Sequence, residues 1–363
     1  MSAAIRWGVV AAVAASVVSG RAAAHVDYVT DGENTVGDVV RFLLETLTDP
    51  MNAALLAGGG VAAGVTIVGY LTFADLVPDV EVARRTLRSY GPYLPWMLRL
   101  SLGLPLVGAG FTGYLFSPAI AVEARFLQVG VGFLLLFGLA TRAVAVVGVV
   151  AYSLTAIQYP LAFHASEYVA GFLAVAVMGP GQPSADMLIK RLAQTDGTVT
   201  GRLAEGVDLS WADPEGGRRA AAVILRVFVG LNFAYLGVSQ KLLEPGRALQ
   251  VVEKYDLTAV VPVAPELWVV GAGLTELAVG TLLVVGFLSR GVAAVAFMMM
   301  TLTLFGLPDD PVLAHVSLFG LASAIMVVGS GPYSVDEVLV PRLRRKLSAR
   351  LRDDAGDVQE SAT

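Results

Sequence analysis

The sequence predicts an all-α polytopic transmembrane helical bundle, made of two tandem four-helix repeats with one or two N-terminal helices before them. The first observation behind this fold class is composition. Hydrophobic residues make up 56% of the 363-residue chain, charged residues only 15%, and the mean hydropathy is +0.70. A soluble protein of this length needs more charge on its surface. The second observation is internal repetition, because blocks of sequence occur twice in the same order.

The repeated blocks define the two copies. A common order indicates duplication of one ancestral bundle. A change of register after the first block leaves extra residues in the second copy, at 246–265, and this stretch is too polar to cross a membrane. The blocks of the first copy and their counterparts are Leu98-Arg99 with Leu225-Arg226, residues 132–142 with 280–290, and residues 181–186 with 331–336.

Residues 1–24 are expected to be a signal peptide or an N-terminal anchor. Arg6 and Arg21 bracket a weakly apolar stretch that is short for a span and typical of a signal-peptide core. The small residues up to Ala24 offer a cleavage site, and a retained first span is the alternative.

Residues 25–92 are expected to contain an extracytoplasmic acidic segment followed by one transmembrane helix. The acidic part, 27–49, indicates a solvated hairpin or surface helix, and residues 52–73 are long and apolar enough to cross. Glycines between Gly58 and Gly64 would let a neighbouring helix approach closely, so we expect this span to dock onto the repeats.

The repeats are placed at residues 93–190 and 219–340, separated by a cytoplasmic linker at 191–218 and followed by a basic, then disordered, cytoplasmic tail at 341–363. Lys and Arg gather before the first repeat, between the repeats and in the tail, and such flanks stay in the cytoplasm. An even number of spans must then separate these flanks, and both repeats share one orientation. The expected spans are 94–115, 122–140, 143–159, 163–180, 220–240, 266–288, 291–306 and 313–329.

A set of residues in the second copy follows a distinctive order, and in this order it resembles the DoxX family of small four-helix membrane proteins. The set comprises Leu225-Arg226, Gly230, the Lys-Leu-Leu-Glu-Pro stretch at 241–245, Glu276, Gly286, Ser289-Arg290 and residues 331–336. The resemblance implies a four-helix bundle per repeat and a multi-pass protein of a bacterial or archaeal cell membrane. Some relatives are subunits of thiosulfate:quinone oxidoreductase, and others are membrane partners of redox enzymes.

The resemblance therefore implies the quinone-facing membrane subunit of an oxidoreductase, which takes electrons from a sulfur compound or another donor through a redox partner subunit. The alternative is a non-catalytic membrane scaffold or carrier with a structural buried glutamate. The first copy departs from the family pattern, with Gln128 in place of Glu276 and Tyr114 in place of Lys241. Any charge-dependent function is accordingly expected in the second repeat alone. Composition and spacing leave open whether the protein is an enzyme.

Glu276 is the first candidate catalytic residue. It lies about ten residues into a span, where an ionised carboxylate costs at least ~2.5 kcal/mol. Asn232 has a similar depth in the preceding antiparallel span, and we expect it to hydrogen-bond Glu276 and share its role. Functionally, Glu276 would accept a proton beside a bound quinone. The alternative is a protonated glutamate that only joins two helices.

The outer edge of the second repeat carries two further expectations. Lys241 and Glu244 are predicted to pair there, with the lysine stem along the apolar surface. Residues 246–265 alternate charged and apolar side chains, which indicates a short amphipathic helix on the outer membrane surface.

His164 and His315 open the fourth span of each repeat and are candidate cofactor ligands, with His315 also a candidate catalytic residue. Facing histidines would hydrogen-bond a quinone carbonyl or hold a haem. The closing blocks align His315 with Ala165, so symmetric haem ligation is the less expected of the two. The plain alternative is an interfacial histidine satisfied by water or backbone. His164 and Glu167 share a helix face but supply only half of a metal site, so no metal is expected.

Several function classes are excluded by the sequence. Cys is absent, which rules out thiolate ligation of zinc or iron-sulfur clusters and disulfide chemistry within this chain. The net charge of -5 and the lack of a basic patch argue against nucleic acid as a partner. No phosphate-binding loop, dinucleotide fingerprint, hydrolase elbow or metalloprotease motif occurs. The lipid bilayer is the one partner that composition requires.

Overall fold

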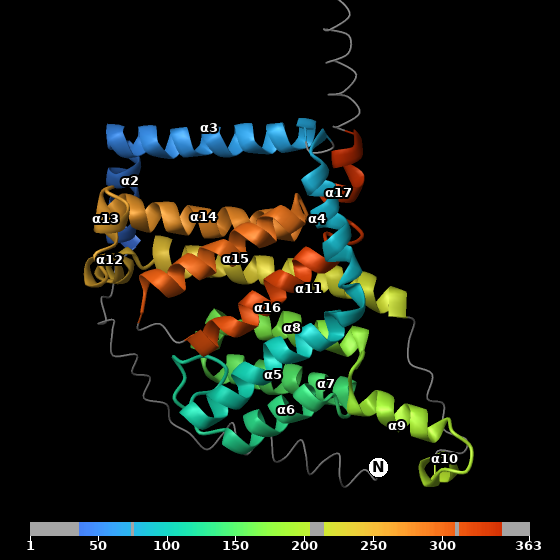
Figure 1. Ribbon diagram of the computed structural model, residues 1–363. Coiled ribbons are helices and arrows are strands. Elements are labelled where there is room, and N and C mark those ends of the chain that lie inside the picture. Colours follow the sequence, from blue (N-terminus) through green and yellow to red (C-terminus); the bar gives the residue numbers. More distant parts are fainter. Residues whose placement is uncertain (1–35, 74–75, 204–213, 309–311, 343–363) are drawn as a thin grey trace, which may run out of the picture.

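The computed structural model describes residues 36–73, 76–203, 214–308 and 312–342 (Figure 1). In this part of the chain the regular structure is helical, and extended backbone is limited to an isolated bridge between Leu115 and Ser117. The all-α fold class is thereby confirmed. The expected signal peptide or anchor at 1–24 and the tail from 343 onward lie outside the described residues.

Two four-helix units follow the N-terminal helices. The N-terminal helices are α2 (Val36–Thr48), α3 (Pro50–Phe73), α4 (Pro78–Ser89) and the 3-10 turn η2 (Gly91–Tyr93). The first unit consists of α5 (Leu94–Thr112), α6 (Arg125–Phe137), α7 (Thr141–Gln158) and α8 (Glu167–Met178), with the 3-10 helix η3 (Pro160–Ala165) before α8. The linker contains α9 (Ala185–Ala193) and α10 (Val199–Leu203).

The second unit consists of α11 (Pro214–Gly237), α14 (Pro265–Val285), α15 (Ser289–Gly306) and α16 (Val312–Val328). Helix α11 runs on into a π-helical turn, η4 (Val238–Leu242). The connection from α11 to α14 forms α12 (Pro245–Lys254) and α13 (Leu257–Val260), so the amphipathic helix expected within 246–265 is present. The short helix α17 (Val335–Val338) closes the described part.

Among the described helices, six segments are long and apolar enough to cross a membrane, and three shorter apolar helices, α6, α8 and α16, accompany them. The lengths correct two expected spans. The span predicted at 163–180 starts as a 3-10 helix and becomes α-helical only at Glu167. The span predicted at 122–140 is helical only from Arg125 to Phe137, because residues 113–124 form an irregular connection folded back onto the unit.

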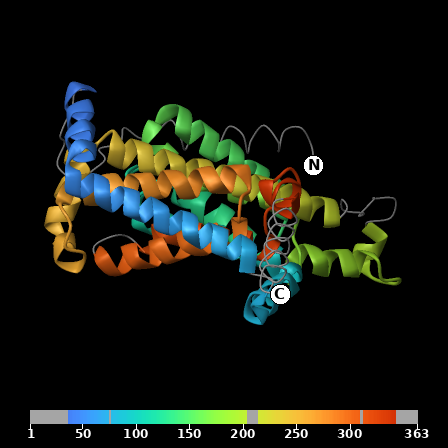
Figure 2. The same ribbon diagram turned by 90° about the horizontal axis from the view of Figure 1, so that it is seen from above.

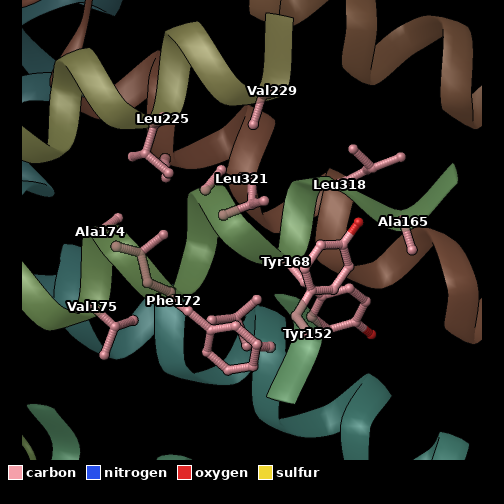
Figure 3. Packing of buried hydrophobic residues seen from close by; sticks show 14 of the residues in the cluster. Tyr152, Ala165, Tyr168, Phe172, Ala174, Val175, Leu225, Val229, Leu318 and Leu321 are labelled. Atoms are coloured by element: carbon pink, nitrogen blue, oxygen red, sulfur yellow. The ribbon is translucent and has the colours of Figure 1, made fainter. Parts of the chain in front are cut away.

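The two units pack against each other in matching pairs. Helix α5 packs on α6 within its unit and on α16 of the other, while α11 packs on α14 and on α8. Figure 3 shows the core that results, in which Tyr168 and Phe172 of α8 and Tyr152 of α7 gather beside side chains of α11 and α16. The first helix of each unit thus packs on the fourth helix of the other, so the interface is built from equivalent helices.

Paired glycines bring the first two helices of each unit together. A Cβ atom at Gly103 would lie 2.9 Å from the carbonyl oxygen of Gly132, and one at Gly132 would lie 2.9 Å from that of Gly103. The same reciprocal contact joins Gly230 and Gly280, at 2.6 and 2.4 Å. Backbones this close leave no room for a side chain, which is the use of small residues in membrane helix packing.

The turn between the second and third helices of each unit is fixed by an aspartate from the segment that follows the fourth helix. Asp186 accepts hydrogen bonds from the backbone nitrogens of Ala140 and Thr141, at 2.7 and 2.8 Å. In the second unit Asp336 accepts from Leu288 and Ser289, at 2.6 and 3.0 Å. Both helix N-termini are therefore capped from outside their own helix.

A buried arginine supports each of these turns. Arg99 donates to the carbonyls of Leu135 and Pro183, and Arg226 donates to Val284, Pro332 and Tyr333. A guanidinium carries several donors in a fixed plane, so one side chain joins the end of one helix to a distant loop. The repeated blocks thus correspond to repeated contacts.

Helices α4, α9 and α17 lie at one end of the bundle, and α2, α12 and α13 lie at the other (Figures 1 and 2). The basic residues before the first unit belong to α4, and Lys190 and Arg191 belong to α9. Both basic flanks therefore sit at the same end, as an even number of spans between them requires.

Helix α3 differs from the expectation. It packs on α2, but a Cβ atom at Gly58, Gly59, Gly60 or Gly64 would meet no atom within 4 Å. Only 6% of the apolar 18-residue stretch of α3 is buried. The expected close docking of these glycines onto the repeats is thus wrong within this chain, because α3 runs along the edge of the assembly (Figure 1).

Candidate functional site

Glu276 forms an ion pair with Lys241. The Nζ atom of Lys241 donates to Oε2 of Glu276 at 2.8 Å, and the two side chains are 24% and 15% exposed, respectively. Glu276 lies in the middle of α14, and Lys241 lies in the π-helical turn η4 at the end of α11. Single π turns inside helices occur often at functional sites. The second unit thus holds a partly accessible ion pair halfway along α14.

Glycines allow this pair to form. A Cβ atom at Gly237 would lie 2.6 Å from the carbonyl oxygen of Gly273 and 2.9 Å from Cβ of Glu276. The end of α11 consequently lies against α14, and the lysine in the following turn reaches the carboxylate. A longer residue at Gly237 would separate the two helices just where the ion pair is made.

Two expected pairings are corrected by this geometry. Lys241 binds Glu276 rather than Glu244, and Glu244 instead pairs with Arg247 at 3.1 Å. The expected hydrogen bond between Asn232 and Glu276 is wrong as well. Asn232 donates to Oγ of Ser166, at 2.9 Å, and more weakly to the carbonyl of His164, at 3.5 Å. Asn232 thus faces α8 and joins the two units, while Glu276 faces η4.

The first unit has a neutral contact at the corresponding place. Gln128 is buried, its Nε2 donates to the carbonyl of Tyr114 at 2.8 Å, and its Oε1 accepts from the backbone nitrogen of Phe116 at 3.0 Å. These bonds fasten the irregular connection 113–124 to α6. An amide does not ionise, so of these two corresponding positions only Glu276 carries an ionisable side chain.

The candidate histidines belong to other elements than the ion pair. His164 belongs to η3, with its ring centroid 5.9 Å from that of Tyr235 on α11. His315 is half-buried in the first turn of α16. In the described part of the chain, no group of three or more His, Cys, Asp or Glu residues gathers closely enough to hold a metal ion.

Glu167 is a buried acid that the sequence analysis considered only as half of a metal site with His164. Glu167 begins α8 and accepts a hydrogen bond from Oγ of Ser317 on α16, at 2.8 Å. A sequence signal existed, because the closing blocks that align residues 181–186 with 331–336 also align Glu167 with Ser317. The contact therefore joins equivalent positions of the two units.

The DoxX family model matches residues 221–309, which run from within α11 to beyond the end of α15 and include Asn232, Lys241 and Glu276. No curated protein and no solved structure matches the chain. The family match therefore supports the resemblance for the second unit, while the likeness of the first unit to the family stays a prediction. Together with the apolar helices, the match shows a multi-pass integral membrane protein.

Proposed function

We propose that this membrane protein with a DoxX domain is the quinone-facing membrane subunit of an oxidoreductase. The observation that carries the proposal is the partly accessible Lys241–Glu276 ion pair at mid-depth in α14. Intramembrane ionisable residues are costly and commonly mark proton or substrate pathways. The pair lies within the region that matches the DoxX family.

The pair suits the protonation steps of quinone chemistry. Reduction of a quinone to a quinol consumes electrons and protons in equal number, and the quinone carries the electrons. Lys241 would donate a proton to a quinone oxygen as electrons arrive, and Glu276 would stabilise its ammonium form and relay the replacing proton. The electrons would come from a redox partner subunit that oxidises a sulfur compound or another donor. Asn232 stands outside this relay because it donates to Ser166, while His164 and His315 stay candidate ligands of the quinone.

The proposed setting is the cell membrane with the C-terminus in the cytoplasm. The support is that α4 and α9, which carry basic residues, share one end of the bundle with α17 (Figure 1). The positive-inside rule places that end in the cytoplasm. The amphipathic α12 then lies on the outer face, close to the end of η4 that carries Lys241.

The test is quinone binding by purified protein in nanodiscs. Lipid extraction and mass spectrometry are expected to find native quinone, and a short-chain quinone analogue is expected to bind saturably. Glu276→Gln and Lys241→Met should each weaken binding of the analogue at least tenfold. The matched control is Glu266→Gln, an exposed acid in the first turn of the same helix, which should bind normally. Absence of quinone together with unsaturable binding would refute the proposal.

A second candidate function is a non-catalytic scaffold. It is favoured by the first unit, in which the neutral Gln128 serves a purely structural contact at the place of Glu276. On this reading Glu276→Gln would leave quinone binding unchanged and alter only stability. The same nanodisc experiment therefore separates the two functions.

A further inference from the structure

Glu167 lies where the two four-helix units meet. Its side chain is on the first residue of α8, which packs against α11 and also contacts α16. The residue is only 2% exposed. Oε1 accepts the hydrogen bond from Ser317 at 2.8 Å, whereas Oε2 is buried and receives no hydrogen bond from the residues that the structure describes. A carboxyl group is thus enclosed between the units with one oxygen unsatisfied.

No cation among the described residues compensates the charge of an ionised Glu167. In the described part of the chain Glu167 forms no ion pair. Figure 3 shows the neighbouring Tyr168 and Tyr152 close together, with Leu318 and Ala165 nearby. The uncharged titratable groups on the elements packed around Glu167 are Tyr152 of α7, Tyr168 of α8, Tyr235 of α11, His164 of η3 and His315 of α16. Arg99 of α5, Arg142 of α7 and Arg226 of α11 donate to backbone carbonyls away from Glu167, and Arg218 and Arg219 lie near the start of α11.

Physical chemistry favours a neutral acid at this place. The N-terminus of a helix stabilises a negative charge modestly. Enclosure of an ionised carboxylate without a partner costs considerably more, and the usual response is to take up a proton. A bound metal ion would need several oxygen ligands, and no group of three acidic or histidine side chains lies close enough in the described residues. A proton, in contrast, neutralises the carboxylate of Glu167 without any further ligand.

We propose that Glu167 is a proton-binding site at the interface between the two units, occupied in the folded protein at neutral pH. The proton makes the carboxyl group neutral and keeps Oε1 available to Ser317. Release of the proton would leave a charge between α8 and α16. The occupied site therefore helps to hold the units together, alongside the contact of Asn232 with Ser166. This inference does not rest on the quinone proposal, which concerns the ionised pair of Lys241 and Glu276 inside the second unit.

Infrared spectroscopy of the full-length protein in nanodiscs tests the proposal. A protonated carboxyl group gives a C=O stretching band that carboxylates lack, and the band shifts on deuteration. At neutral pH this band is expected in the wild type and should be lost in Glu167→Gln. The matched control is Glu276→Gln, which should retain the band, because Glu276 is ion-paired with Lys241. A band of full intensity in Glu167→Gln, or no band in the wild type, would overturn the proposal.

A second variant keeps the proposal testable if Glu167→Gln fails to fold. Ser317→Ala removes the donor to Oε1 but leaves the acid in place. Its carboxyl band should persist and move to higher frequency, because the C=O group loses a hydrogen bond. A band that does not move would belong to another residue, and the assignment to Glu167 would be wrong.

Discussion

The Nζ atom of Lys241 lies 2.8 Å from Oε2 of Glu276, at the place where the first unit joins Gln128 to the carbonyl of Tyr114 by a neutral hydrogen bond. The equivalent places of the two units therefore carry a charged contact in one and a neutral contact in the other. Gln128 shows that the position can be occupied by a structural side chain. A charged pair is therefore not required to fasten the helices at this position.

The ion pair is expected to be energetically coupled. Glu276→Gln should lower the free energy of unfolding by about 1–2 kcal/mol, between the values for exposed pairs and for broken buried pairs, since both side chains are partly accessible. Lys241→Met added to Glu276→Gln should cost little more. Chemical unfolding in detergent measures the cycle, and Glu244→Gln, whose pair with Arg247 is more exposed, serves as the control. Strictly additive effects would contradict the pairing.

The contact between Gly230 and Gly280 is expected to tolerate no side chain. Gly280→Ala would place a Cβ atom 2.4 Å from the carbonyl oxygen of Gly230, so α11 and α14 must separate, at a cost of about 1–3 kcal/mol. Gly271→Ala on the same helix meets no atom within 4 Å and should be neutral or slightly stabilising. The apparent melting temperatures of the two variants decide the matter. Equal melting temperatures would mean that the helices are not in close contact.

Asp336 is expected to fix the turn before α15. Asp336→Ala removes the acceptor of two backbone N–H groups, and we expect a loss of about 1.5–3 kcal/mol in the free energy of unfolding. Asp186→Ala should cost a similar amount, because it makes the equivalent bonds in the first unit. Asp196→Ala, an exposed position between α9 and α10, should change little. Thermal unfolding of the three variants compares them, and a small effect at Asp336 would reject its role as a cap.

Asn232 is expected to couple to Ser166 and not to Glu276. In a double-mutant cycle, Asn232→Ala and Ser166→Ala should show an interaction of about 0.5–1.5 kcal/mol, because the two side chains share a hydrogen bond at 2.9 Å. The cycle of Asn232→Ala with Glu276→Gln should be additive within the error of unfolding experiments. Coupling found only in the second cycle would restore the pairing that the sequence suggested.

The sequence predicted much of the architecture. The excess of apolar over charged residues required a membrane setting, and the apolar stretches located the helices of both units to within a few residues. The repeated blocks also indicated where contacts recur. Asp186 and Asp336 are the last residues of the two copies of one block, and each caps the turn that precedes the third helix of its unit. Such regularities are local or periodic, so they can be read along the chain.

What the sequence could not decide was which way each polar side chain faces. It placed Asn232 and Glu276 at a similar depth, but each residue turns a helix by about 100° and depth says nothing of direction. The π turn at Val238–Leu242 further sets the direction of Lys241. Only the packing of α8 and α14 on different sides of α11 assigned Asn232 to Ser166 and Lys241 to Glu276, and only the meeting of α8 with α16 enclosed Glu167. Composition and periodicity thus determined that helices cross the membrane, whereas tertiary packing decided which of their buried charges are paired.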